Sequence, residues 1–139
     1  RKRLGGAPLV KLLLDTHVWV WSMLDPARLS RKTSTILRSP ENDLWLSSIS
    51  LWEFLMMVEK GRILLREETD RWLAAAFEKA PINEAPLSFE IVRTSRTMRF
   101  SHRDPADHFI AATALTLDLT LITADEHLLR LEGIKTLSA

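Results

Sequence analysis

Short apolar runs of strand length alternate with helix-type segments along this 139-residue chain, and this alternation constrains the fold more than any other feature. LVKLLLD at 9–15, DLWLSS at 43–48 and LTLIT at 119–123 are nearly continuous apolar runs, typical of strands that are covered on both faces. IKTLS at 134–138 predicts an edge strand, and PINEAPLS at 81–88 holds a brief one. Because parallel strands need crossover connections, the sequence predicts an α/β fold: a single-domain open parallel sheet of about five strands, with helices on both faces.

The segments between these runs have the patterns of helices. THVWVWSML follows the first strand, ISLWEFLMMVEKG follows the second and is ended by Gly61, and Pro81 stops an amphipathic segment at 67–80. Further helices are expected at 87–99, 104–118 and 124–131. Residues 1–8, RKRLGGAP, are expected to be a flexible basic leader outside the folded domain at 9–139.

Composition excludes several classes of function. Hydrophobic residues make up 46% and charged residues 27%, as in soluble globular proteins, and no apolar run is long enough to span a membrane. The chain has no cysteine, which removes disulfides and thiolate metal sites and fits a reducing cytoplasm. Its net charge of +1 predicts that any nucleic acid is bound by a local patch. Neither G-x-x-x-x-G-K-[ST] nor G-x-G-x-x-G occurs, so a glycine-rich phosphate cradle is not supported.

Four carboxylates fall where parallel strands end or the following helices begin. Asp15 ends the first strand, Glu53 lies early in the helix after the second, Asp107 opens a helix, and Asp125 follows LTLIT. In an open α/β sheet, these positions share the edge at which ligands bind. Each also has a structural alternative. Asp15 can cap a helix, Ser50-Leu-Trp-Glu53 matches a capping box, and Thr123-Ala-Asp-Glu126 matches another that leaves Asp125 free.

Asp104 and Asp107 stand three residues apart before an apolar helical run. Pro105 suits the first position of a helix, so Asp104 is expected to be the N-cap, while the helix dipole favours a carboxylate at Asp107. Asp107 also shares a helical face with Ala111 and Ala114, which predicts that its side chain points inward. Asp104 is a possible additional acid of the same site.

Carboxylates that converge without a matching lysine or arginine repel one another unless a hard divalent cation binds them. The sequence therefore predicts a site for Mg²⁺ or Mn²⁺, with one or two ions. The histidines lack the spacing of zinc ligands and are expected to have surface or packing roles: His17, His102, His108 and His127.

LLLDTHVWVW, SSISLWE, DPADHFIAATA and LITAD resemble, in order and spacing, the four acidic motifs of the PIN domain family, and most closely those of VapC-type toxins. The resemblance covers the chain from residue 9 onward and implies a PIN-like fold. It implies Asp15, Glu53, Asp107 and Asp125 as catalytic residues and Thr123 as a supporting residue. Asp15, Asp107 and Asp125 would be the metal ligands, and Glu53 a ligand or a base that positions water.

The activity that this resemblance implies is that of a metal-dependent endoribonuclease, which cleaves single-stranded regions of RNA and is the toxin of a toxin–antitoxin pair. The implied partners are RNA, a cognate antitoxin and a second copy of the chain in a homodimer, with no membrane. The apolar helices at 17–24 and 49–58 could form a groove for an antitoxin segment. Two other functions stay open: a non-catalytic RNA-binding or assembly module on the same fold, and a metal-dependent phosphohydrolase.

Basic residues just before the aspartate pair are candidates for RNA binding. Arg93, Arg96, Arg99 and Arg103, with His102, concentrate positive charge and could form a phosphate track, although a solvated helix face is the alternative. The five tryptophans lie in apolar segments and are expected in the core or an interface.

Overall fold

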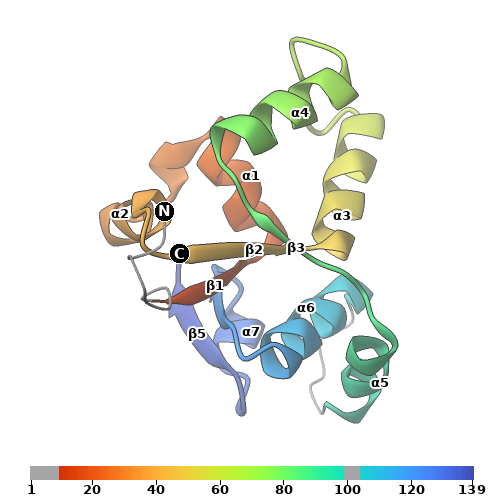
Figure 1. The fold of residues 1–139 in the computed structure, drawn as a ribbon. Helices are drawn as coiled ribbons and strands as arrows, with labels where there is room; N and C mark the ends of the chain where they lie inside the picture. The colour runs from red at the N-terminus through yellow and green to blue at the C-terminus, as the bar shows by residue number, and fades with distance from the viewer. Residues whose placement is uncertain (1–9, 99–103) are drawn as a thin grey trace.

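The computed structural model describes residues 10–98 and 104–139, which form a parallel sheet flanked by helices (Figure 1). The strands are β1 (Lys11–Leu14), β2 (Asp43–Ser47), β3 (Asn83–Ala85), β4 (Thr120–Thr123) and β5 (Lys135–Ser138). The helices are α1 (Thr16–Leu24), the short 3₁₀ helix η1 (Pro26–Arg28), α2 (Arg31–Arg38), α3 (Ser48–Glu59), α4 (Thr69–Lys79), α5 (Phe89–Thr97), α6 (Pro105–Thr116) and α7 (Glu126–Leu129).

The sheet has five strands in the order β3-β2-β1-β4-β5, and every neighbouring pair is parallel. The first strand of the chain is therefore the central one, with β2 on one side and β4 on the other. The strand order reverses at β1, and in open α/β sheets the crevice beside such a reversal is where ligands bind. The loops that leave the carboxyl ends of β1 and β4 lie at this crevice.

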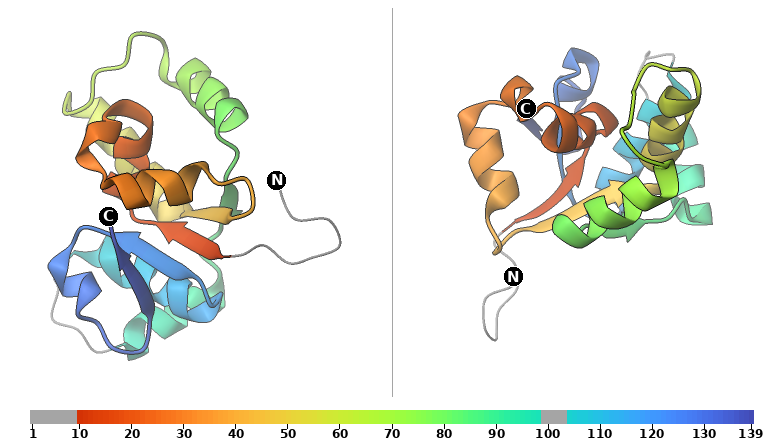
Figure 2. Two further views of the ribbon diagram at one scale, coloured as in Figure 1. Left: turned by 90° about the vertical axis from the view of Figure 1, so that its left-hand side faces the viewer. Right: turned by 90° about the horizontal axis from the view of Figure 1, so that it is seen from above.

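Helices cover both faces of the sheet and create two cores. Helices α1 to α4 lie on one side, and α5 to α7 lie on the other (Figures 1 and 2). Alternate residues of β1 divide between the cores: Leu12 and Leu14 pack with Val18 and Phe54, whereas Leu13 packs with the α6 residues. All of these β1 side chains are buried, which explains why the strand reads as a continuous apolar run.

The predicted architecture is confirmed: a single-domain open parallel sheet with helices on both faces. The strand predicted at 9–15 is observed as β1 at Lys11–Leu14. The helix predicted at 104–118 is observed as α6 at Pro105–Thr116, and it ends before Asp118, which has a left-handed φ of 53°. Leader 1–8 lies outside the described residues. Among the described helices, none has the length and apolar character needed to cross a membrane.

Two helices between β1 and β2 were not predicted. Helix α2 begins after Ser30, whose side chain accepts a hydrogen bond from the backbone N–H of Thr33. A serine before a helix-forming segment is an N-cap signal, so α2 could have been found from the sequence. Only Thr33 of its residues is buried, and a short, largely polar helix gives a weak apolar pattern.

Candidate active site

A cavity of about 400 Å³ lies at the carboxyl ends of β1 and β4. It is the one place where all the predicted acidic residues of the described chain meet. Its lining residues are Asp15, His17, Trp21, Arg28, Glu53, Asp104, Asp107, Ala124 and Asp125. Positions more than a hundred residues apart in sequence thus share one cavity, because the parallel topology brings strand ends and helix starts to one edge.

Asp15 and Asp125 are joined through the hydroxyl of Thr123. Thr123 Oγ1 donates a hydrogen bond of 2.6 Å to Asp15 Oδ2 and accepts one of 3.0 Å from the backbone N–H of Asp125. Asp15 is also the N-cap of α1, since its Oδ1 accepts a bond of 2.8 Å from the N–H of Thr16. Thr123 is fully buried, so its hydroxyl fixes the two acidic residues relative to each other.

Glu53 is held by a second hydroxyl, from the first residue of α1. Thr16 Oγ1 donates to Glu53 Oε1, and the same oxygen lies 2.8 Å from Ser50 Oγ. Because the Thr16 hydroxyl has a single proton, the proton between Thr16 and Ser50 belongs to Ser50. Glu53 is therefore oriented toward α1 by the buried hydroxyl of Thr16, which the buried hydroxyl of Ser50 supports.

The two aspartates of α6 differ in exposure. Asp104 is exposed and is the N-cap, with its Oδ1 3.0 Å from the backbone N–H of Ala106 that donates to it. Asp107 lies in the first turn and is only 8% exposed. Ala111 and Ala114 on the same face are buried as well, as the sequence predicted. Both carboxylates line the cavity.

Burial and mutual repulsion make the site unfavourable for charge. Loss of solvation raises the pKa of Asp15 above its ordinary value, and the bonds from Thr123 and Thr16 offset part of that rise. Loss of solvation also raises the pKa of Glu53; the bond from Thr16 opposes the rise, whereas the charges of Asp104 and Asp15 add to it. Both carboxyls therefore hold their protons more tightly than exposed ones.

Some of the acidic residues cap helices, as the sequence suggested, but both predicted capping boxes are wrong. Asp15, Asp104 and Asp125 each cap a helix, with Asp125 Oδ1 accepting from the backbone N–H groups of His127 and Leu128. The capping box proposed for Glu53 is wrong, because α3 begins at Ser48 and is capped by Ser47. The box from Thr123 to Glu126 is wrong too, because Asp125 itself is the cap of α7.

The donor set of the cavity is chemically suited to a hard divalent cation, since it consists mainly of carboxylates. Within residues 10–98 and 104–139, however, no three acidic or histidine side chains stand close enough together to hold an ion as they are placed. The caps and the Thr123 bond account for part of this spacing, because they turn Asp15 and Asp125 toward backbone N–H groups. The residues fit a metal by their chemistry, while a closed coordination shell is not preformed.

Sequence reasoning missed the aromatic and basic side of this cavity. His17, expected to have a surface or packing role, lines it, and its ring centroid lies 5.9 Å from that of Trp21. Arg28, which was not singled out from the sequence, also lines the cavity, with its guanidinium 4.6 Å from the Trp21 ring centroid. The spacing of His17 and Trp21, four residues apart on one helical face beside Asp15, was the available signal.

Two of the predicted RNA-binding arginines, Arg93 and Arg96, lie away from this cavity. Arg93 and Arg96 are exposed on α5, which packs against α6, but neither lines the acidic cavity. Arg99, His102 and Arg103 fall outside the described residues. Four tryptophans are buried or half-buried, as expected, whereas Trp52 on α3 is 57% exposed.

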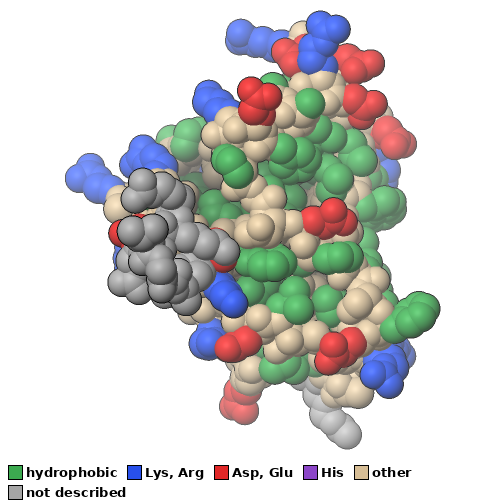
Figure 3. All heavy atoms as spheres, in the orientation of Figure 1, with side chains coloured by type: hydrophobic (Ala, Val, Ile, Leu, Met, Phe, Trp, Pro, Cys, Tyr) green, Lys and Arg blue, Asp and Glu red, His purple; other side chains and the backbone are tan. Residues whose placement is uncertain are grey.

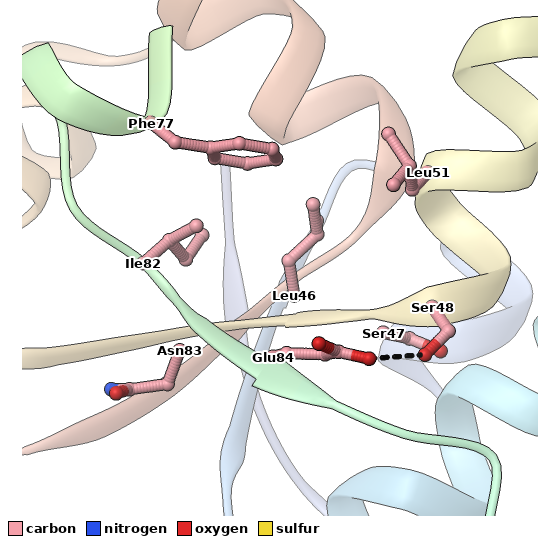
Figure 4. A pocket seen from close by; sticks show the side chains of 8 residues that line it. All are labelled: Leu46, Ser47, Ser48, Leu51, Phe77, Ile82, Asn83 and Glu84. Atoms are coloured by element: carbon pink, nitrogen blue, oxygen red, sulfur yellow. Dashed lines mark hydrogen bonds between the residues drawn. The ribbon is translucent and has the colours of Figure 1, made fainter. Parts of the chain in front are cut away.

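A second cavity, of about 260 Å³, is apolar in character and lies between β2, β3, α3 and α4. Hydrophobic side chains gather over this region of the surface (Figure 3). Leu46, Leu51, Phe77 and Ile82 surround it, and its carboxylate, Glu84, accepts a long 3.5 Å hydrogen bond from Ser48 (Figure 4). With a single acidic side chain, this cavity lacks the ligand chemistry of the first.

The PIN domain family model matches residues 12–134 of the chain. This chain belongs to the PIN domain family. Ribonuclease VapC22 of Mycobacterium tuberculosis is 30% identical to this PIN domain over 121 residues, which cover 86% of this chain and 91% of that protein. The resemblance to VapC-type proteins, found from the acidic motifs, is thereby confirmed.

Solved structures share the PIN fold over nearly the whole chain. VapBC2 from Rickettsia felis, solved with a DNA fragment from its promoter, gives a TM-score of 0.69 with 16% identity, covering 94% of this chain and 99% of that one. VapBC-5 from Mycobacterium tuberculosis, a member of the VapBC family of toxin–antitoxin systems, gives 0.56 with 23% identity, covering 93% and 97%. At these identities the likeness is one of fold.

Proposed function

We propose that this PIN domain protein is a metal-dependent endoribonuclease that cleaves single-stranded regions of RNA and is the toxin of a toxin–antitoxin pair. The observation that carries the proposal is the convergence of Asp15, Glu53, Asp107 and Asp125 on one cavity, with Thr123 joining two of them. The similarity to Ribonuclease VapC22 supports RNA as the substrate.

Asp15, Asp107 and Asp125 would hold one or two Mg²⁺ or Mn²⁺ ions. A bound ion of this kind lowers the pKa of water and stabilises negative charge on phosphate oxygens. The carboxylates repel one another, and a bound cation would offset this repulsion and bring them closer together. The buried Asp15 and Asp107 would be the principal ligands, and the half-buried Asp125 would be a further or water-mediated ligand.

Glu53 is the residue that we assign to orient the attacking water and accept its proton. The water oxygen forms the new bond to phosphorus and its proton passes to Glu53. The bond from phosphorus to the ribose oxygen breaks, and the released oxygen takes a proton from solvent. Thr16 keeps the Glu53 carboxylate at the cavity, and Thr123 keeps Asp15 in place. Proton transfer to a positioned carboxylate requires this fixed geometry.

RNA cleavage with Mg²⁺ or Mn²⁺, with and without chelator, tests the proposal. We expect the native protein to cut single-stranded RNA only with metal, and Asp15→Asn to be inactive yet folded, because asparagine also caps helices. Hydrolysis of a generic phosphomonoester in the same buffer would instead indicate a phosphohydrolase. Metal-independent cleavage, or binding without cleavage by the native protein, would contradict the nuclease assignment.

An antitoxin partner and a homodimer complete the proposal, with the cytoplasm as the place of action. Solved VapBC complexes of the same fold support an antitoxin partner.

The sequence predicted a groove for an antitoxin segment between the helices at 17–24 and 49–58. The apolar cavity instead lies between α3 and α4, and an apolar antitoxin side chain would fit there. Exposed hydrophobic side chains support the dimer: Trp52 on α3, Phe89 and Val92 on α5, and Leu115 on α6. Co-expression with the product of the neighbouring open reading frame should relieve toxicity and yield a copurifying complex.

A further inference from the structure

Arg28 carries the charge opposite to that of the carboxylates in its cavity, yet they do not pair with it. Its guanidinium carbon lies over the Trp21 ring, 4.6 Å from the ring centroid. Among residues 10–98 and 104–139, no acidic side chain forms an ion pair with Arg28. The side chain is therefore placed by an aromatic face and keeps its charge available at the cavity.

The backbone around Arg28 is anchored. Asp25 N–H donates to the carbonyl of Trp21 at 2.8 Å, and Arg28 N–H donates to the carbonyl of Asp25 at 3.1 Å. The next residue, Leu29, is buried in the core that contains α1. This 3₁₀ turn therefore fixes the point from which the exposed Arg28 side chain reaches the cavity.

A cation–π contact occupies none of the five N–H donors of a guanidinium, so they stay available for an acceptor. A guanidinium edge matches two oxygens of a phosphate, whereas the carboxylates of the cavity repel the same anion. His17 extends the aromatic side of the cavity from the same face of α1 as Trp21. Among the described residues that line this cavity, Arg28 is the one with a permanent positive charge, so it is the one that attracts an anion there.

We propose that Arg28, held against Trp21, binds an RNA phosphate next to the phosphate that is cleaved. This assignment rests on the proposed function, because it gives a substrate contact to the same cavity. In this role Arg28 binds the RNA equally strongly in the ground state and in the transition state. Its loss should therefore raise KM and leave kcat nearly unchanged.

Binding is measured without cleavage, using the Asp15→Asn protein, chelator and a short fluorescein-labelled single-stranded oligoribonucleotide. Adding Arg28→Gln to this protein should weaken binding about tenfold, the effect of losing one charge-assisted hydrogen bond. The slope of log affinity against log salt should also fall by about 0.7, as expected for one phosphate contact to a single strand. Arg71→Gln, which removes an exposed arginine of α4 outside the cavity, is the matched control and should change neither.

The role of the ring is tested separately. Trp21→Phe keeps an aromatic face and should retain most of the affinity, whereas Trp21→Leu should weaken binding while the salt slope stays unchanged, because the charge remains. Melting curves of every variant identify loss of folding. If Arg28 only supports the turn, Arg28→Gln lowers the melting temperature and leaves the salt slope of the folded protein unchanged, which overturns the inference.

Cleavage assays on the native protein and on the single variant Arg28→Gln distinguish failure of the Arg28 assignment from failure of the nuclease proposal. If the native chain cuts RNA and Arg28→Gln binds it with native affinity and salt slope, the Arg28 assignment fails and the nuclease stands. If the native chain neither binds nor cuts single-stranded RNA, the proposed function fails, and the Arg28 assignment fails with it. A raised KM with unchanged kcat for Arg28→Gln, beside an unaffected Arg71→Gln, supports both.

Discussion

Replacing Thr123 by valine tests whether one hydroxyl positions the acidic site. The change is nearly isosteric at a fully buried position and removes the donor to Asp15 Oδ2 and the acceptor of the Asp125 N–H. The bond to the carboxylate contributes about 1.5–3 kcal/mol, and the backbone N–H left without its partner costs about 1 kcal/mol more. Gaining a buried methyl group returns about 1 kcal/mol. We therefore expect a net loss of about 1.5–3 kcal/mol in the free energy of unfolding.

Urea unfolding and thermal melting measure this loss, and for a domain of this size it corresponds to a fall of about 5–10 °C in Tm. Thr123→Ser is the matched control, because it keeps both hydrogen bonds and loses only a methyl group, at about 1 kcal/mol. RNA cleavage should follow the hydroxyl, so serine should be far more active than valine. A valine variant that is as stable and active as the serine variant would refute this account of the site.

A double-mutant cycle with Asp15→Asn divides the effect between the two hydrogen bonds. If the hydrogen bond to Asp15 accounts for most of the lost stability, Thr123→Val should lower the free energy of unfolding clearly less in the Asp15→Asn protein than in the native protein. Equal costs in the two backgrounds would mean that the Asp125 N–H accounts for the stability.

Four further predictions concern the same cavity. Mg²⁺ or Mn²⁺ should raise the melting temperature of the native protein, because a ligand that binds only the folded state stabilises it; no shift at millimolar metal would contradict the ion site. Asp104→Asn should keep the stability and much of the activity, whereas Asp104→Ala should cost about 1 kcal/mol. Asp107→Asn should stay folded but lose cleavage and metal-induced stabilisation, and equal inactivity of both Asn variants would assign both carboxylates to the site. Because burial raises the folded-state pKa values of Asp15 and Glu53, their stabilising contribution is complete below about pH 4 and is lost as the pH rises through the raised values. Without metal, stability should therefore decline over that range, and Glu53→Gln should lessen the decline in urea unfolding measured against pH.

The acidic half of the site could be predicted because it follows from topology. Asp15, Glu53, Asp107 and Asp125 stand at strand ends or early in helices, and a parallel sheet brings all such positions to one edge. Their helix caps were also visible in part, although a capping sequence alone did not show that Asp125 rather than Thr123 begins α7.

The basic half could not be predicted in the same way. Arg28 lies in a short turn after α1, and no periodic pattern reports where such a turn directs a side chain. Its place depends on the burial of Leu29 and on the face that Trp21 presents, and both are tertiary contacts. The distances between the carboxylates could not be predicted either, because they depend on which backbone N–H groups the carboxylates accept from.

The central position of β1 has a consequence for how the protein is made. Synthesis produces this strand first, but its neighbour β4 emerges only after α6 has been made. Thr123 and Asp125 arrive with β4, so a ribosome-bound chain that has not reached residue 120 contains Asp15 and Glu53 without the group that fixes Asp15. Parallel pairing between strands so distant in sequence is also slow, because a long loop must close first. The nascent chain should therefore remain inert for most of its synthesis, and nuclease activity should emerge in one late step, when β4 inserts beside β1.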